Sequence, residues 1–305
     1  MNNRRVILSC NSHTIDRMVE SADGEWSVEQ TLTKHQVTCL TEGGFNPGIV
    51  YAGTRECGVW RSKDTGKTWE NAGMRGQIVK SLAVSPQDPK TLYAGSKPAL
   101  IFRSTDGGES WHELEGFREI PNRWWWFSPA DPPDKRPYVI EIAPSPTDPD
   151  VVLAGVEFGG VFRSEDGGDT WSPHLRGSLR DCHSLKFHAD DGNYAYEAGG
   201  SGGGASISRD GGRTWQKTKK GLAKSYGIVC AADGEKPDTW YACVGASPWK
   251  TVGENSEAFL YRHNGGDRWE PIGWEDHPLN ETPTAMVSIP GKTGELYVGT
   301  HKGSV

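Results

Sequence analysis

Long apolar runs are absent from this 305-residue sequence. No stretch of 18 consecutive apolar residues occurs, whereas a transmembrane helix needs about 20 of them. The first 17 residues, MNNRRVILSCNSHTIDR, lack the apolar core of a secretory signal peptide. We therefore expect a cytoplasmic protein that has no membrane partner.

An excess of positive charge is absent as well. The 33 lysine and arginine residues are outnumbered by 40 aspartate and glutamate residues, so the formal net charge is −7 at pH 7. Proteins that bind nucleic acids in general carry basic patches that neutralise phosphate groups. The sequence therefore predicts no nucleic-acid partner.

Paired cysteines are also missing. The six cysteines, at positions 10, 39, 57, 182, 230 and 243, form no Cys-x-x-Cys motif. Disulfide frameworks are typical of small secreted proteins and are rare in the cytosol. The spacing therefore favours reduced thiols over disulfide bonds, in agreement with the expected cytoplasmic location.

Helical periodicity of useful length does not occur, and this absence indicates an all-β chain. The 39 glycines and 19 prolines separate many short apolar segments. Segments of two kinds alternate, and we interpret them as the inner and the second strand of a repeated sheet. Asp-Pro turns join several of these pairs, because proline fixes φ in a turn. The predicted pairs are residues 78–86 with 91–96, 138–146 with 151–156, 183–190 with 193–200, 227–233 with 239–244, and 284–291 with 295–300.

One short motif recurs along the whole chain. Its clearest copy, RSEDGGDTW at residues 163–171, follows an apolar strand and leads into the next one. The glycines allow positive φ in a tight turn, and the aspartate accepts hydrogen bonds from backbone N–H groups just ahead of it. The tryptophan is suited to packing between neighbouring sheets. Further copies lie at residues 61–69, 103–111 and 208–215, with a degenerate copy at 261–269 and a shorter one at 20–26.

The spacing of the motif predicts a repeat architecture. The closing tryptophans stand at positions 26, 69, 111, 171, 215 and 269, so the steps are 43, 42, 60, 44 and 54 residues. A period of this length is typical of a four-stranded propeller blade. The chain begins on a second strand, continues through five sets of four strands, and ends with an incomplete last blade at residues 284–305. We therefore expect a single domain over residues 1–305.

The pattern Ser-x-Asp-x-Gly-x-Thr-Trp resembles the Asp-box, or bacterial neuraminidase repeat, of sialidase-like and glycosyl-hydrolase-like β-propellers. The resemblance implies an all-β propeller of four-stranded antiparallel blades, seven in number, with six as the alternative. It also implies that the Asp boxes lie at the turn between the third and fourth strands, away from any active site. Five equivalent aspartates cannot share one catalytic centre, so we expect these residues to be structural.

Candidate site residues lie on the opposite face of such a propeller. There, the loops that enter each inner strand meet the loops between second and third strands, and polar residues that converge on a concave mouth indicate a binding site. We predict no metal and no cofactor, because His183 and His188 are five apart on a strand and point to opposite faces. The predicted anion contacts are Arg55, Arg75 and Arg180, the predicted proton-transfer residues are Glu56, Glu157 and His183, and further ligand contacts are Tyr138, Tyr226 and Lys250.

A long insertion occupies residues 115–137. It contains Trp124, Trp125, Trp126 and Phe127 together with five prolines. Because both its ends are expected at the mouth, we predict that the loop overhangs the mouth. Its tryptophans either stack on a ligand, as aromatic rings do on sugars, or pack as a plug or an interface with another protein.

Two classes of function stay open at this point. In the first, the chain binds, and as a hydrolase of the glycosidase kind cleaves, a small anionic or sugar-like ligand at the mouth. In the second, it is a non-catalytic scaffold that holds a protein partner through the same face. The sialidase motif Phe/Tyr-Arg-Ile-Pro has only a distant counterpart, at residues 117–121, where Glu119 is inserted. This departure argues against a sialidase.

Overall fold

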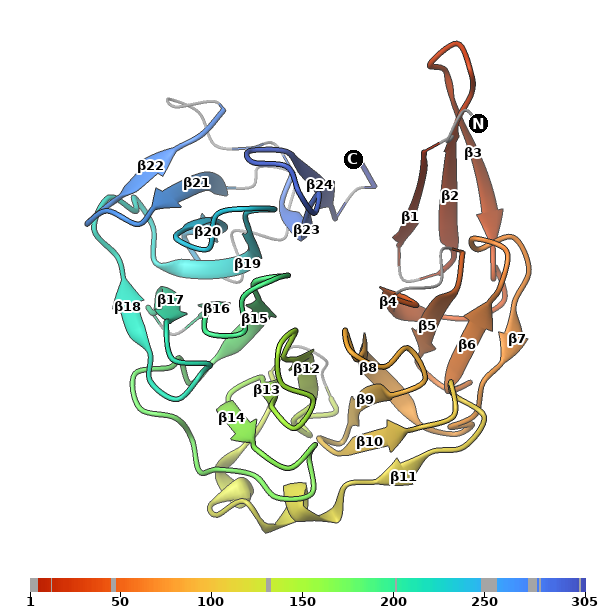
Figure 1. Cartoon of the computed structure of the whole chain (residues 1–305), viewed down its shortest axis with the longest axis horizontal. Helices are drawn as coiled ribbons and strands as arrows, with labels where there is room; N and C mark the ends of the chain where they lie inside the picture. Colours follow the sequence, from red (N-terminus) through yellow and green to blue (C-terminus); the bar gives the residue numbers. More distant parts are fainter. Residues whose placement is uncertain are drawn as a thin grey trace. The chain divides into compact units, whose positions relative to one another are not determined.

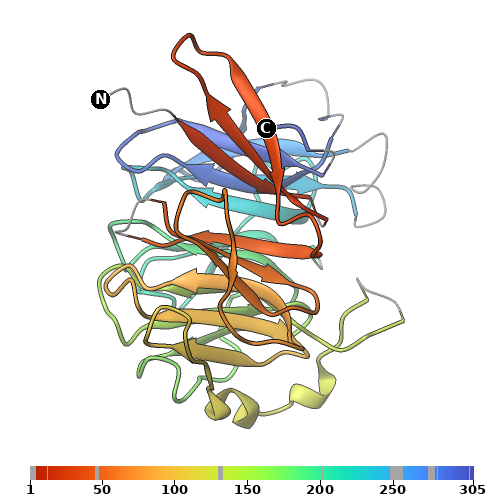
Figure 2. The same ribbon diagram turned by 90° about the vertical axis from the view of Figure 1, so that its right-hand side faces the viewer.

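The computed structural model of the chain consists of short antiparallel strands and two 3-10 turns (Figures 1 and 2). It describes residues 5–11, 13–44, 48–129, 133–200, 202–247, 257–273, 279, 281–301 and 303–305. The chain divides into two compact units, Met1–Glu113 and Leu114–Val305, and each is described by itself. Within the described ranges, no helix has the length and apolar character needed to cross a bilayer.

Unit 1 contains three sheets in which neighbouring strands are consecutive in the chain. The first sheet has three strands and the other two have four strands each, so every connection is a hairpin. The strands are β1 (Val6–Cys10), β2 (Ile15–Glu20) and β3 (Trp26–Thr31); β4 (Val37–Glu42), β5 (Val50–Thr54), β6 (Val59–Ser62) and β7 (Glu70–Asn71); and β8 (Ile78–Val84), β9 (Leu92–Lys97), β10 (Ile101–Ser104) and β11 (His112–Glu113).

Unit 2 opens with the 3-10 turns η1 (Glu115–Glu119) and η2 (Arg123–Trp125) and then forms four sheets of the same kind. Together with unit 1, the described residues therefore form seven sheets, the number expected for seven blades. The strands of unit 2 are β12 (Val139–Pro144), β13 (Val152–Val156) and β14 (Gly160–Ser164); β15 (Cys182–Phe187), β16 (Ala195–Gly199), β17 (Gly204–Ser208) and β18 (Gln216–Thr218); β19 (Tyr226–Ala232), β20 (Thr239–Gly245), β21 (Phe259–Asn264) and β22 (Trp269–Pro271); and β23 (Pro283–Ser288) and β24 (Leu296–Thr300).

The hydrophobic core lies between successive sheets. The second strands β13, β16 and β20 are buried along their whole length, and apolar residues of the preceding and the following sheet pack against β16 and β20. In unit 2, one cluster joins Leu153 and Val161 to Leu185 of the next sheet. Another joins Ile207 to Trp240 and Trp269 one sheet further on. Each sheet thus depends on its neighbours for burial, as in other repeat proteins.

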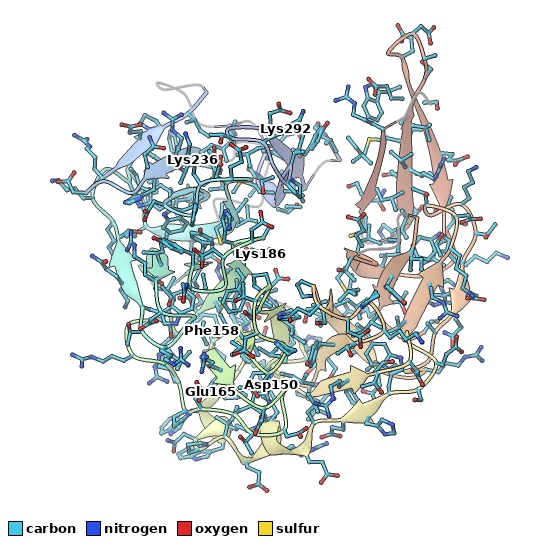
Figure 3. The ribbon with its side chains drawn as sticks, viewed as in Figure 1. Asp150, Phe158, Glu165, Lys186, Lys236 and Lys292 are labelled. Carbon is cyan, nitrogen blue, oxygen red and sulfur yellow. The ribbon has the colours of Figure 1, made fainter. Side chains whose placement is uncertain are left out.

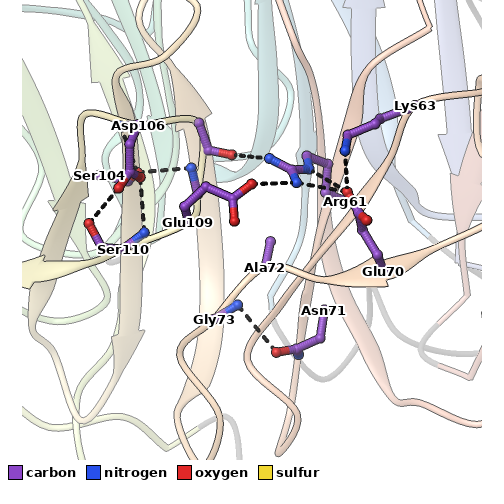
Figure 4. Close-up of polar contacts among 12 residues, drawn as sticks. Arg61, Lys63, Glu70, Asn71, Ala72, Gly73, Ser104, Asp106, Glu109 and Ser110 are labelled. Carbon is purple, nitrogen blue, oxygen red and sulfur yellow. Dashed lines mark hydrogen bonds and ion pairs between the residues drawn. The ribbon is translucent and has the colours of Figure 1, made fainter.

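The Asp boxes are closed hydrogen-bond networks, as the sequence predicts. In the copy drawn in Figure 4, the Ser104 hydroxyl donates to Asp106 Oδ1 at 2.8 Å, and Gly108 N donates to Ser104 Oγ at 2.9 Å. Ser110 then donates to both Asp106 oxygens, from its N–H at 2.9 Å and from its hydroxyl at 2.6 Å. The boxes of Asp64, Asp166 and Asp210 repeat this arrangement. The turn hydrogen bonds predicted for these aspartates are confirmed.

The tryptophans that close the boxes connect successive sheets. Trp111 Nε1 donates to the Ala72 carbonyl at 2.8 Å, and Trp269 Nε1 donates to the Thr218 carbonyl at 3.0 Å. Arg61 adds an ion-pair link of the same kind, because its guanidinium reaches Glu70 in its own sheet and Glu109 in the next (Figure 4). The repeat therefore fixes both a turn and the contact between neighbours.

Two predicted strands are absent from the described structure. After Trp171, Ser172 N bonds to the Arg163 carbonyl and Leu175 N to the Val161 carbonyl, but no regular fourth strand forms beside β14. Pro173 lies between them and has no N–H group to donate. At the other end, Thr300 N bonds to the Ser304 carbonyl in a turn, where the sequence suggested the start of a third strand.

Candidate functional site

Three ionisable side chains from two segments of the chain meet in unit 2. Glu157 follows β13, Asp181 precedes β15, and His183 lies within β15. One ligating atom of each side chain lies within 4.8 Å of the other two. Both carboxylates are buried, with Glu157 5% and Asp181 2% exposed, and His183 is partly buried. We refer to Glu157, Asp181 and His183 as the carboxylate–histidine cluster.

A β-bulge aims the histidine into this cluster. In the β15–β16 pair, Cys182 is opposite Gly199 and Ser184 is opposite Ala198, so His183 is the extra residue of the bulge. Bulges re-aim side chains and are frequent beside functional sites. The alternation rule placed His183 and His188 on opposite faces, and it did not foresee this redirection.

The hydrogen bonds of His183 define its tautomer. Its Nδ1 lies 2.7 Å from the Gly227 carbonyl oxygen, which can only accept, so Nδ1 carries a proton. Its Nε2 lies 3.2 Å from Asp181 Oδ1. Burial alone would lower the pKa of His183, but the hydrogen bond and charge of Asp181 outweigh burial and raise that pKa. The ring therefore binds a proton more tightly than an ordinary histidine does.

Hydroxyl groups orient the carboxylate of Glu157. The buried Ser128 donates a short hydrogen bond to Glu157 Oε2. The Tyr138 hydroxyl also bonds to Glu157, and burial together with this carboxylate raises the pKa of Tyr138. Burial and the charge of Asp181 raise the pKa of Tyr226, whose ring centroid lies 5.0 Å from that of His183. Both phenols therefore stay protonated near neutral pH and can act as donors.

The structure brings five residues together: four that were predicted as site residues and one that was not. Glu157, His183, Tyr138 and Tyr226 were predicted from the sequence, and Asp181 joins them. Asp181 could have been found by its position directly before a predicted inner strand. Ser128 could not, because the long insertion brings it to Glu157.

The predicted basic contacts do not enter this cluster in the part of the chain that the structure describes. Arg180 is exposed on the segment before β15. Arg55, Glu56 and Arg75 belong to unit 1, where Arg75 Nε donates to Asn71 Oδ1 at 3.1 Å. Lys250 lies outside the described residues. The roles assigned to these residues stay predictions.

The insertion packs along the outer strand of its sheet. Phe117 is fully buried and meets the Asp-box Trp171 edge to face at 5.2 Å. Trp126 is 9% exposed, and its ring centroid lies 4.9 Å from that of Phe162 in β14. Figure 1 shows the two 3-10 turns, in yellow, beside β14. Trp126 is therefore a packing residue, and its predicted role as a ligand contact is corrected.

This course has a physical reason. Because no fourth strand covers β14, the insertion supplies the apolar side chains that cover this edge instead. Gly116 packs against the Asp-box backbone so closely that a Cβ would lie 1.9 Å from the Asp169 carbonyl oxygen. The segment then runs to Ser128, which reaches Glu157. The loop thus follows the sheet edge, which differs from the expected overhang.

Trp124 and Trp125 remain on the surface. They are 74% and 66% exposed, and their rings stack on each other with centroids 4.2 Å apart. Phe127 is also exposed and stacks on Phe158 of the β13–β14 connection, which is labelled in Figure 3. These two pairs present aromatic faces to solvent.

Unit 1 carries a shallow concavity of its own, with a volume of about 340 Å³. Two tryptophans, a histidine and two lysines contribute to its wall, and the rings of His35 and Trp60 lie 4.4 Å apart. None of the ligand contacts or proton-transfer residues predicted from the sequence lines it. The residues around it are Gln30, Thr31, Leu32, Thr33, Lys34, His35, Trp60, Lys67 and Trp69.

Comparison with solved structures shows the fold. An ancestral GH74 enzyme superposes with a TM-score of 0.67 at 19% identity over 87% of this chain and 35% of that enzyme. The GH74 enzyme of Niastella koreensis gives a TM-score of 0.63 at 17% identity over 86% of this chain and 40% of its own. Ycf48 bound to D1 peptide gives 0.63 at 14% identity over 99% of this chain and 88% of its own. This chain spans about a third of the ancestral enzyme.

Sequence comparison points to the repeat. No curated protein matches the chain. The family model described as BNR/Asp-box repeat matches residues 102–113 and 206–217, which cover two of the boxes. These matches, the repeated hydrogen-bond networks and the superpositions agree on one architecture. The chain therefore carries BNR/Asp-box repeats and has the fold of a β-propeller.

Proposed function

We propose that the chain binds a small, hydroxyl-rich, sugar-like ligand at the carboxylate–histidine cluster. The convergence of Glu157, from the connection after β13, with Asp181 and His183, at the start of β15, carries this proposal. Carboxylate oxygens accept hydrogen bonds from sugar hydroxyls, and Tyr138 and Tyr226 add phenolic groups on either side. Such a convergence of polar groups is typical of a ligand site.

The charge of the cluster favours a neutral sugar over an anion. The cluster contains two acidic side chains and one histidine, so its acidic groups outnumber its basic one. A buried negative charge repels an anionic ligand strongly, because the surroundings screen it poorly. The arginine nearest in sequence, Arg180, is exposed. Of the two ligand classes predicted from the sequence, anionic and sugar-like, we therefore propose the sugar-like one.

If the chain is an enzyme, the proposed reaction is hydrolysis of the bound sugar. Retaining glycosidases hold two carboxyl groups about 5–5.5 Å apart, and the cluster holds its ligating atoms within 4.8 Å. We assign Glu157 to the chemistry at the sugar, because hydrogen bonds from Ser128 and Tyr138 hold its carboxylate in place. The fold shared with GH74 enzymes is compatible with such a reaction, although fold alone does not specify function.

Calorimetric titration with neutral oligosaccharides and with sugar acids tests the proposal. We expect saturable binding of a neutral sugar and at least about tenfold weaker binding by Glu157→Gln, since a hydrogen bond to a charged group contributes about 1.5–3 kcal/mol. Glu295→Gln is the control, because Glu295 makes an exposed ion pair with Lys292 (labelled in Figure 3). Equal affinity of Glu157→Gln, or a preference for sugar acids, would count against the site. Release of reducing ends would show hydrolysis.

A protein partner is the second candidate, and the exposed aromatic pair supports it. Trp124 and Trp125 offer a stacked apolar surface, and exposed tryptophans are enriched at protein interfaces. Ycf48, which shares the fold, has been solved with a bound peptide. We also propose a cytoplasmic location, which the six free cysteines support.

A further inference from the structure

We infer that the carboxylate–histidine cluster binds one divalent first-row transition-metal ion, Zn²⁺ or Mn²⁺. The ligands are one oxygen each of Glu157 and Asp181 and Nε2 of His183. This inference goes beyond the proposed sugar ligand, because the protein alone supplies these three donors. It departs from the expectation, drawn from strand alternation, that the histidines form no metal site.

The donor set selects the class of cation. Imidazole nitrogen together with carboxylate oxygen suits Zn²⁺ and Mn²⁺, whereas Ca²⁺ and Mg²⁺ take sites made of oxygen atoms. Three protein ligands leave at least one coordination position open, as in catalytic zinc sites. That position would accept water or an oxygen atom of a ligand.

The orientation of His183 fits a metal ligand. Its Nδ1–H donates to the Gly227 carbonyl at 2.7 Å, so Nε2 of the neutral ring presents a lone pair to the cluster. Histidines that bind metals almost always donate their other N–H group in this way. Nε2 lies 3.2 Å from Asp181 Oδ1, near the edge of about 3.4 Å expected for ligands about 2.1 Å from a tetrahedral metal ion. A cation held between these two atoms would contact both of them.

Groups outside the cluster orient the remaining ligand. The hydroxyl of Ser128, which is fully buried, donates to Glu157 Oε2, and Tyr138 bonds to the same carboxylate. Hydrogen bonds of this kind hold ligating carboxylates in position around metal ions. Two of the three ligands thus have a supporting contact already in place.

The other sheets provide an internal comparison. All six inner strands of the described structure carry a bulge at the same point. Among the described residues, only the β15 bulge places a histidine beside two carboxylates from neighbouring segments. The bulge is therefore a property of the fold, and the cluster is specific to one position in it. The extra residues at the other bulges are Thr38, Lys80, Ile140, Ile228 and Thr284.

Metal titration of the full chain tests the inference. The protein is stripped with a chelator and titrated with ZnCl₂ or MnCl₂ in the absence of any sugar, by calorimetry and, for Mn²⁺, by electron paramagnetic resonance. We expect one ion per chain. Loss of a ligand in His183→Gln or Asp181→Asn should weaken binding by about 100-fold or more, and Ser128→Ala by about tenfold. Circular dichroism checks that each variant folds.

The control is His112→Gln, because His112 is an exposed histidine on β11 in unit 1. Its affinity for the ion should equal that of the unmodified chain. No stoichiometric binding, or unchanged binding in both His183→Gln and Asp181→Asn, would overturn the inference. A chain that binds the ion but no sugar would keep the inference and overturn the proposed function. Sugar binding in the presence of chelator, without any metal uptake, would keep the proposed function and overturn the metal inference.

Discussion

The two kinds of acidic site in unit 2 differ in where their partners come from. In the Asp box, Asp166 accepts hydrogen bonds from the Ser164 hydroxyl and from the N–H and hydroxyl of Thr170, all within four residues. In the carboxylate–histidine cluster, Glu157 comes from the connection after β13 and faces Asp181 and His183 at the start of β15. Donors nearby in the chain satisfy the carboxylate of Asp166. The side chains of the cluster instead come together at one point, where they can bind a ligand. We therefore assign a structural role to the Asp box and a functional role to the cluster.

The degenerate box shows which part of the repeat the fold needs most. Asn264 stands where the other copies have aspartate, and its side chain bonds to Glu270 Oε2 at 3.1 Å. The turn is completed by Gly265 N, which donates to His263 Nδ1 at 3.2 Å. Trp269 nevertheless stays buried and bonds to the Thr218 carbonyl. The tryptophan contact between sheets therefore persists where the aspartate network does not.

The largest expected effect concerns Trp126, because its segment packs between the Asp box and the cluster. Trp126→Ala removes a buried ring from the edge of β14 and should lower the free energy of unfolding by about 3–5 kcal/mol. Trp124→Ala is the matched control, since that ring is exposed, and should change it by less than about 0.5 kcal/mol. Chemical denaturation measures both. Equal losses would show that the exposed pair also packs.

The second prediction uses pH to contrast exposed and buried carboxylates. Hydrogen bonds from Thr68 lower the pKa of the Asp-box residue Asp64 to about 2. Glu197, in the middle of β16, accepts from Leu179 N and the Ser206 hydroxyl, yet burial raises its pKa to about 8. The folded state therefore binds the proton more tightly than the unfolded state.

The sign of the effect follows from linkage. Between the ordinary pKa of 4.5 and about 8, folded Glu197 holds more protons than the unfolded residue, so this stabilisation is present below pH 4.5 and is lost as the pH rises to about 8. In Glu197→Gln, the free energy of unfolding should depend less on pH over this window. Denaturation at several pH values measures the slope. An unchanged slope would contradict a raised pKa.

The third prediction tests the saturated site directly. Asp166→Ala leaves the N–H of Thr170 and the hydroxyl of Ser164 without their acceptor, which should lower the free energy of unfolding by about 1–3 kcal/mol. Binding of sugar or Zn²⁺ should be unchanged, because the box contributes no group to the cluster. Thermal denaturation measures the loss of stability, and calorimetry measures the binding of sugar or Zn²⁺. Weaker binding with unchanged stability would refute the structural role.

The smallest expected change in stability lies at the cluster. In Glu157→Gln, the amide oxygen can still accept from Ser128 and Tyr138, so the free energy of unfolding should change by less than about 1 kcal/mol. Binding should fall nevertheless, in contrast to Asp166→Ala. A large loss of stability in this variant would show that Glu157 mainly supports the fold.

The sequence alone determined the strands and the Asp boxes. The inner strand expected at 78–86 appears as Ile78–Val84, and the second strand expected at 239–244 appears as Thr239–Gly245. The boxes were predictable because every donor to their aspartates lies within four residues in the chain. Interactions of such short range follow from the order of residues.

Only the tertiary structure decided the site and the course of the insertion. The β15 bulge turns His183 toward Asp181, and strand alternation contains no sign of it. Ser128 reaches Glu157 because its segment covers β14, which lacks a fourth strand. The contacts of Glu157 with Ser128 and with the segment of Asp181 and His183 join residues distant in the chain, and they depend on how successive sheets pack. Packing between residues far apart in the chain leaves no periodic pattern in the sequence, so it could not be predicted from the sequence.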